Sequence, residues 1–282
     1  MSMQPPRDKE AQRDDGLQPF ADALRQRVPS KEALLAEAKQ LSKRHSQRRK
    51  VAASGLLGLA LATSVWVLDP VWHYQDVQVA IGQRQQLTLA DGSLVQLNSG
   101  SHLRIEKRLR SRQVVLENGQ AVFTVVHDDK PFIVRSQGVQ VRDIGTVFDV
   151  LSDSRGVNVS VLDGVVEVSN QGSNVQRLEA GQQILASSNS LGTVHGFDRA
   201  LLSAWQQGKL RFDGTPLSTV LADLQHYRLA PIRLADSQTG ELRLSGEFDS
   251  NAVEALIRLL PSILPVTVQR SGNGAVLVSR LR

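Results

Sequence analysis

The stretch "RQVVLENGQAVFTVV" (residues 112–126) is the part of the chain that most directly indicates its fold. Val, Leu and Phe are concentrated in both halves of the stretch, and Asn118-Gly119 lies between them. Asn-Gly is a strong hairpin signal, because its turn needs positive φ at both central residues. The stretch therefore predicts two antiparallel strands that are joined by a turn at residues 118–119.

The same pattern continues on both sides of this stretch. Short segments with alternating apolar and polar residues are separated by Gly-containing turns at residues 91–92, 137–138 and 163–164. No helical period is present between residues 77 and 190. Short strands with frequent turns predict an all-β domain over residues 77–188, built as a sandwich, a barrel or a solenoid-like stack.

The pattern changes again in the last part of the chain, residues 204–282. Two segments there have apolar residues at helical spacing, and each is flanked by short strand-like segments. We expect a small α+β domain built as a duplicated strand–helix–strand unit, with Pro261 ending the second helix. The side chains expected to be buried on the two helices are Val220, Leu221, Leu224, Val253, Leu256, Ile257 and Leu260.

An apolar segment follows a basic run near the start of the chain. Eighteen uncharged residues, 51–68, come directly after Arg48, Arg49 and Lys50. We predict a transmembrane helix over residues 51–72, with the basic run fixing the amino terminus in the cytoplasm and directing export of the remainder. A signal peptide cleaved after Ala62 and a buried globular helix are the alternatives.

Residues 1–50 form a short tail with two stretches at helical spacing. Two short amphipathic helices bury little surface by themselves, so we expect the tail to fold onto a partner. The alternative is a helix that lies on lipid at the membrane surface. The apolar residues expected to contact the partner are Leu17, Phe20, Leu24, Leu34 and Leu41.

The sequence offers no set of residues for catalysis or for a cofactor. It has no Cys, and its six His residues show no metal-ligand spacing. The first 50 residues hold 12 Lys and Arg against 7 Asp and Glu, whereas the remaining residues hold 21 of each. The large part of the chain thus lacks the positive charge that direct nucleic-acid binding needs. We predict no enzymatic activity, no cofactor and no metal.

Four stretches carry a resemblance to a known family. They are "LTLADGSLVQLNSGSHLRI" (87–105), "VRDIGTVFDV" (141–150), "VSVLDGVVEV" with "LEAGQQ" (159–168 and 178–183), and "AWQQGKLRFDGTPLSTVLADLQHY" (204–227). Together these stretches resemble the FecR family, single-pass inner-membrane regulators of extracytoplasmic-function (ECF) sigma factors. The family's cytoplasmic part is usually longer and rich in Trp, whereas the 50-residue tail here has no Trp.

The resemblance implies a set of partners. The tail would bind an ECF-type sigma factor, and the C-terminal domain would contact the signalling domain of a TonB-dependent outer-membrane receptor that senses an iron ligand. A regulated intramembrane protease would release the tail. The resemblance leaves open whether the tail inhibits or activates the sigma factor. The residues expected at the periplasmic contact, either as core or as an edge-strand surface, are Trp205, Leu210, Phe212, Pro216 and Leu217.

A second class of function is compatible with the same sequence. The duplicated C-terminal unit is also similar to small domains of secretins and of TonB-dependent receptors. The chain would then be an anchored structural or assembly protein of the envelope that binds no sigma factor. Residues 1–50 distinguish the two, because only the regulator needs them to bind a sigma factor.

Overall fold

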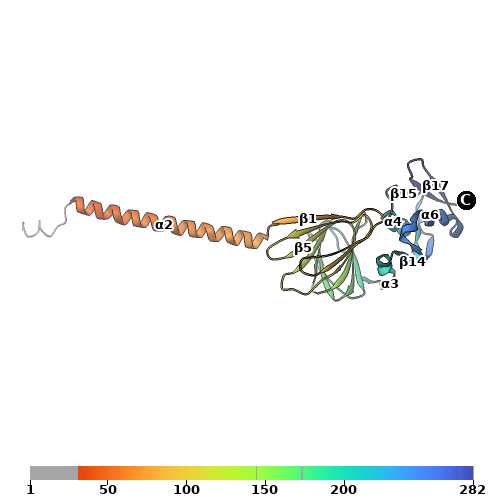
Figure 1. Cartoon of the computed structure of the whole chain (residues 1–282), viewed down its shortest axis with the longest axis horizontal. Helices are drawn as coiled ribbons and strands as arrows, with labels where there is room; N and C mark the ends of the chain where they lie inside the picture. Colours follow the sequence, from red (N-terminus) through yellow and green to blue (C-terminus); the bar gives the residue numbers. More distant parts are fainter. Residues whose placement is uncertain (1–30, 144, 173, 282) are drawn as a thin grey trace, which may run out of the picture. The chain divides into compact units, whose positions relative to one another are not determined.

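The structure is a computed structural model, and it describes residues 31–143, 145–172 and 174–281 (Figure 1). The chain divides into two units, residues 1–67 and 68–282. The described part of the first unit is one long helix. The second unit contains a β domain (residues 73–196) and a C-terminal module (residues 199–281).

Helix α2 spans Lys31–Leu68 without interruption. The segment around residues 36–50 is rich in Ala, Lys, Arg, Gln and Glu, which favour helix, and contains neither Gly nor Pro. The helix ends before Asp69, which has a positive φ of 43° and precedes Pro70. A residue before proline is disfavoured in the α conformation, so the chain leaves the helix at this point.

This helix corrects the predicted organisation of the first 72 residues. Among the described residues, no helix has an apolar stretch long enough to cross a membrane. The predicted transmembrane helix over residues 51–72 is therefore wrong, and so is the fold class that combined it with separate short cytoplasmic helices. Residues 31–50 continue directly into the apolar segment because no helix-breaking residue separates them. The first predicted tail helix lies outside the described residues.

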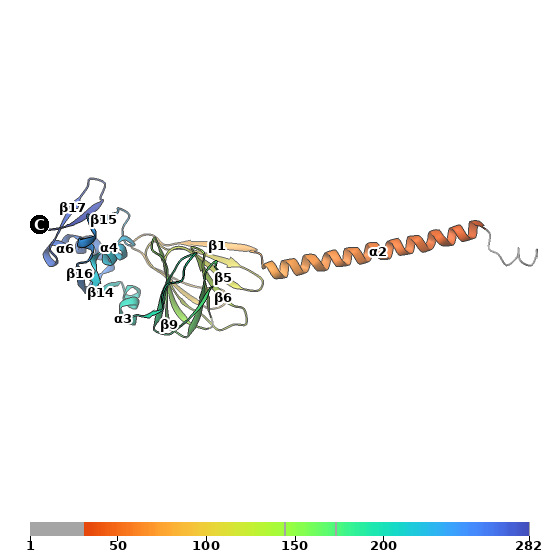
Figure 2. The same ribbon diagram turned by 180° about the vertical axis from the view of Figure 1, so that it is seen from behind.

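The β domain is one folded sheet of 13 strands, which curves into a half barrel (Figures 1 and 2). One face has the order β1-β4-β5-β6-β7-β10-β11 and the other the order β2-β3-β5-β8-β9-β12-β13. All pairs are antiparallel except β5 with β6. The strands are β1 His73–Gln78, β2 Gln85–Thr88, β3 Leu94–Leu97, β4 His102–Lys107, β5 Arg112–Thr124, β6 Phe132–Ser136, β7 Val139–Asp143, β8 Val147–Asp153, β9 Gly156–Asp163, β10 Val165–Ser169, β11 Val175–Glu179, β12 Gln182–Ala186 and β13 His195–Gly196.

Strand β5 connects the two faces, and it corrects the predicted hairpin. Residues 112–118 of β5 pair with β4, and residues 119–124 pair with β3 and β8. Asn118-Gly119 is not a turn between two strands but a bend inside one strand, with a register shift against β4. Gly119 has φ of 93°, and a Cβ placed there would lie 2.5 Å from the Cα of Ser101. Glycine is therefore needed because the bend brings two backbones together.

The two faces enclose one hydrophobic core, made mainly of Val and Leu side chains from alternate strand positions. Three fully buried Phe rings lie within it. The ring of Phe123 on β5 lies 5.2 Å from that of Phe148 and 5.9 Å from that of Phe132, measured between centroids. Because these rings come from β5, β6 and β8, they connect both faces through the core.

The C-terminal module has a separate core and a strand–helix–strand plan that occurs twice. Strands β14 and β16 form one sheet, and β15, β18 and β17 form another, in which β15 and β18 are parallel. The elements are α3 Arg199–Ser203, η1 Ala204–Gln207, β14 Lys209–Pro216, α4 Leu217–Gln225, β15 Ile232–Leu234, α5 Ser237–Gly240, β16 Arg243–Asp249, η2 Ser250–Ala252, α6 Val253–Ile263, β17 Val266–Arg270 and β18 Val276–Arg280.

Helices α4 and α6 supply much of this second core. All seven side chains predicted to be buried on the two helices are buried, which confirms the helical spacing inferred from the sequence. Pro261 does not end α6, which continues to Ile263. Its ring is compatible with the last turn because proline mainly disrupts a helix interior.

Candidate functional site

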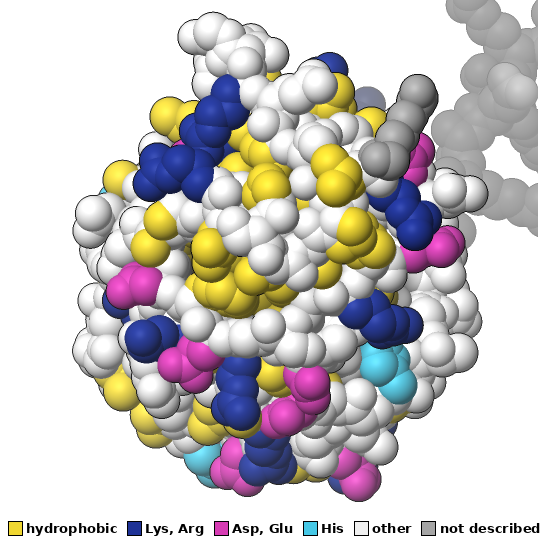
Figure 3. All heavy atoms as spheres, turned by 90° about the vertical axis from the view of Figure 1, so that its right-hand side faces the viewer, with side chains coloured by type: hydrophobic (Ala, Val, Ile, Leu, Met, Phe, Trp, Pro, Cys, Tyr) yellow, Lys and Arg dark blue, Asp and Glu magenta, His cyan; other side chains and the backbone are white. Residues whose placement is uncertain are grey.

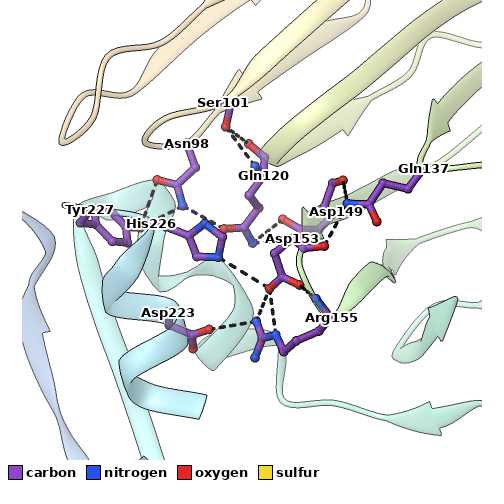
Figure 4. A network of polar contacts seen from close by, with 11 residues as sticks. Asn98, Ser101, Gln120, Gln137, Asp149, Asp153, Arg155, Asp223, His226 and Tyr227 are labelled. Atoms are coloured by element: carbon purple, nitrogen blue, oxygen red, sulfur yellow. Dashed lines mark hydrogen bonds and ion pairs between the residues drawn. The ribbon is translucent and has the colours of Figure 1, made fainter. Parts of the chain in front are cut away.

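The candidate site is the junction between the β domain and the C-terminal module. It brings the loops and strand ends at one end of the β domain against η1 and the carboxy-terminal end of α4 (Figure 4). Figure 4 draws a group of polar and charged side chains there, which point toward one another. We call these contacts the junction network.

Asp153, Arg155 and Asp223 form the charged part of the junction network. Arg155 Nη2 lies 2.5 Å from the Asp153 carboxylate and 3.4 Å from that of Asp223 on α4. His226 Nε2 lies 3.7 Å from the same Asp153 carboxylate. Arg155 therefore links the turn after β8 to α4, and Asp153 links the end of β8 to His226, the residue that follows α4.

The pKa values of the two acids reflect this arrangement. Burial raises the pKa of Asp153, but the nearby His226 imidazole and the hydrogen bonds from Arg155 outweigh burial and hold the pKa well below its usual range. Burial raises the pKa of Asp223 on α4, although Arg155 and His226 oppose the shift. Arg155 therefore stabilises the charged forms of both carboxylates.

A second part of the junction network is a chain of neutral hydrogen bonds that ends at a buried acid. The Asn98 amide donates to the Tyr227 hydroxyl at 2.9 Å and to Gln120 Oε1 at 2.8 Å. The Gln120 amide in turn donates to both oxygens of Asp149, at 3.0 and 3.2 Å. Burial also raises the pKa of Tyr227 to about 12, so the hydroxyl keeps its proton at neutral pH.

Asp149 is a fully buried carboxyl group on β8. Its neighbours Phe148 and Val150 face the β-domain core, and Asp149 points to the opposite side of the sheet, toward the module. Burial raises its pKa to about 7, although hydrogen bonding from Gln120 opposes the shift. Trp205 on η1 is near enough to lower this pKa, but its buried indole N–H does not reach hydrogen-bond geometry.

Backbone carbonyl groups of the module complete the junction. Arg84 Nη1 donates to the carbonyl oxygens of Trp205 and Gln206, each at 2.9 Å. The Ser99 hydroxyl donates to the His226 carbonyl at 2.7 Å. These bonds hold the two ends of the module's contact surface, η1 and the end of α4, against loops of the β domain.

The junction is incompletely filled. A cavity of about 560 Å³ lies beside the network. Residues of β8, β9 and β12 line it on the β domain, and residues of α3, β14 and α4 line it on the module. Apolar side chains line it together with the network residues; they include Leu151, Leu185, Phe197, Trp205 and Phe212.

The residues predicted for the periplasmic contact have different positions. Leu210, Phe212 and Leu217 are buried in the module core, whereas Trp205 is buried at the junction and is a member of neither core. Pro216 is half-buried and immediately precedes α4.

The residues predicted for the sigma-factor contact and for topology lie in the first unit or outside the described residues. Leu34 on α2 is exposed. Leu41 and the basic residues 48–50 also belong to α2, but their side chains are outside the described ones. Leu17, Phe20 and Leu24 lie outside the described residues altogether.

The arrangement is suited to holding two domains together and shows no constellation for chemistry. In the described ranges, no group of three or more His, Cys, Asp or Glu residues is placed to bind a metal ion. Sequence reasoning missed the polar residues of the junction network, because a polar residue on the outer side of a strand has the same pattern whether water or another domain covers it.

The comparisons with known proteins agree with this architecture. Residues 75–167 match the family described as FecR protein. These residues are a FecR domain. It lies within the β domain and includes β5, the Phe cluster and Asp149, which confirms the resemblance inferred from the sequence motifs.

Two crystal structures, at 2.50 and 1.65 Å resolution, resemble a larger part of the chain. Both are described as a candidate anti-sigma factor from Parabacteroides distasonis ATCC 8503. Each is 29% identical in sequence with a TM-score of 0.62, and the similarity covers 74% or 73% of this chain and 99% of the other. No curated protein is significantly similar to this chain.

Proposed function

We propose that this protein regulates a sigma factor and receives its signal through the β domain and the C-terminal module. The observation that carries the proposal is the FecR domain at residues 75–167 together with the likeness to a candidate anti-sigma factor over 74% of the chain. A likeness of this extent includes the module as well as the FecR domain.

The proposed sigma factor belongs to the ECF class, and residues 1–50 bind it. Leu34 and Leu35 support this assignment, because both are large apolar side chains on α2 with about half of their surface exposed. Exposed apolar side chains on a helix are the kind that a partner's hydrophobic groove accepts. Leu17, Phe20, Leu24 and Leu41 extend the same surface in this proposal.

The proposed signal comes from the signalling domain of a TonB-dependent outer-membrane receptor and concerns iron uptake. The module contacts that domain in the periplasm, beside the inner membrane, and a regulated intramembrane protease acts after the contact. The module surface supports a protein contact: hydrophobic side chains gather in the middle of the face seen in Figure 3. Its large exposed hydrophobic side chains are Leu229, Leu259, Ile263, Leu277 and Leu281.

The proposal is tested by affinity purification of the full-length chain from its own host, followed by mass spectrometry. The full-length chain is expected to recover an ECF sigma factor. A variant with Leu34→Lys and Leu35→Lys is expected to lose it, because two charges enter the apolar surface. The matched control, with Leu229→Lys on the module, is expected to retain the sigma factor. Recovery of equal amounts with all three proteins would contradict the assignment to residues 1–50.

A further inference from the structure

The β domain and the C-terminal module have two separate cores. The buried hydrophobic clusters share no residue, and each is closed by its own strands and helices. Among the described residues, the contacts across the junction come from loops and helix ends and not from elements packed along one another. Neither core therefore requires the other domain to be in place.

The junction itself is held mainly by polar contacts. Its polar contacts among the described residues include the charged group Asp153–Arg155–Asp223 with His226, the Asn98–Tyr227 pair, and the bonds from Arg84 and Ser99 to backbone carbonyls. The cavity of about 560 Å³ lies beside them. Polar and incompletely packed interfaces within one chain resemble transient protein–protein interfaces, and relative domain motion is the usual consequence.

We propose that the junction is a reversible latch, in which the C-terminal module separates from the β domain as an intact folded unit. This inference rests on the proposed function, because it supplies the conformational change through which a partner of the module would act on the rest of the chain. A partner that competes for the end of α4, or moves it, releases the latch. Release uncovers Ser99, Gln120 and Asp149 on the β domain and Trp205 on the module.

Arg155 is the residue on which the latch depends most. It is the cation placed between the two carboxylates, and Asp223 on α4 would lose its ion-pair partner on the β domain if the guanidinium were removed. It also lies at the carboxy-terminal end of α4, where a positive charge interacts favourably with the helix dipole. Replacing it weakens docking and leaves the contacts of both cores unchanged.

The test uses the absence of Cys from the natural sequence. The full-length chain with Ser99→Cys carries one thiol at the junction, where the natural side chain is 2% exposed. The full-length chain with Ala121→Cys carries one thiol in the β-domain core, at a fully buried position. Labelling by N-ethylmaleimide, followed by mass spectrometry, measures how often each position opens to solvent.

Arg155→Gln is expected to accelerate labelling at position 99 about tenfold, the change that corresponds to ~1.4 kcal/mol of docking free energy. Labelling at position 121 is expected to stay unchanged. Arg155→Lys, which keeps the charge, should give a smaller acceleration. The matched control is Arg177→Gln, which removes an exposed arginine 3.9 Å from Glu179, outside the junction. It should change neither rate.

Two results would overturn the latch. Unchanged labelling at position 99 would show that the network does not hold the module. Equal acceleration at positions 99 and 121 would show that the two domains open as one cooperative unit. The labelling test does not depend on the sigma factor. If the natural full-length chain recovered no sigma factor in the purification above but the labelling rates were as expected, the proposed function would be contradicted and the latch would stand.

Discussion

Asp149→Asn gives the sharpest test of the buried acid at the junction. The carboxyl group is fully buried and has a pKa raised to about 7, against an ordinary value of 3.8. Well below pH 3.8 it is protonated in both the folded and the unfolded chain, so its ionisation costs no stability there. As pH rises from 4 to 7, the unfolded chain loses this proton and the folded chain still holds it. Stability therefore falls over this range and is constant above it.

The magnitude follows from the two pKa values. Each unit of difference is worth about 1.4 kcal/mol, so ionisation of Asp149 costs roughly 4 kcal/mol above pH 7. Between pH 5 and pH 8 the cost grows by roughly 3 kcal/mol, since part of it is already present at pH 5. Asparagine does not ionise, and its amide oxygen can still accept the hydrogen bond from Gln120.

The measurement is urea unfolding of the full-length proteins, followed by circular dichroism at pH 5 and pH 8. We subtract the free energy of unfolding of the natural protein from that of Asp149→Asn at each pH. This difference should be roughly 3 kcal/mol larger at pH 8 than at pH 5, which means that the variant gains stability relative to the natural protein as pH rises. Asp213→Asn, at an exposed position, is the control and should follow the natural protein. The reasoning is refuted if Asp149→Asn and the natural protein show the same dependence on pH.

Other substitutions test the β domain itself. Gly119→Ala should lower the free energy of unfolding by more than about 2 kcal/mol, because the new Cβ would meet the backbone of Ser101 in addition to the strain of positive φ. Gly181→Ala, which has positive φ but open space around it, should cost about 1 kcal/mol; equal costs in thermal unfolding would contradict the close approach. Phe123→Ala should cost about 3–5 kcal/mol, whereas Val175→Ala at an exposed position should change stability by less than about 0.5 kcal/mol. A small effect of Phe123→Ala on the urea midpoint would show that the Phe cluster does not anchor the core.

The turn chemistry of the sequence predicted many strands correctly and one connection wrongly. Asp91-Gly92 and Gln137-Gly138 do lie in turns between paired strands. Asn118-Gly119 has the same chemistry but lies in a bend of β5. A turn between two strands and a bend within one strand can both place a glycine at positive φ. The strands that pair with the segment distinguish the two, and those strands are distant in sequence.

The helices of the module were predicted more fully than the first helix of the chain. Helical spacing identified the buried faces of α4 and α6, because each face packs against strands of the same small domain. For residues 31–72 the same reasoning divided one helix into parts and extended it past Asp69-Pro70. The change from charged to apolar composition is no boundary of α2, whereas the residue before Pro70 is.

The junction could not be predicted from sequence. Asp153, Arg155, Asp223 and His226 are separated by up to 73 residues, and each has the composition of an ordinary surface turn or helix end. Only the packing of one domain on another converts them into a partly buried network. Asp149 shows this most clearly, since its strand has the alternation expected of a sheet with one face in water.

The central claim, regulation of a sigma factor, is tested most directly by measuring transcription across the genome of the host. Three strains are compared, with the full-length chain, without the chain, and with a chain that lacks residues 1–50. The account predicts that promoters of one ECF sigma factor change when the chain is removed and change in the same genes when only residues 1–50 are removed. An unchanged set of promoters in both strains would contradict it.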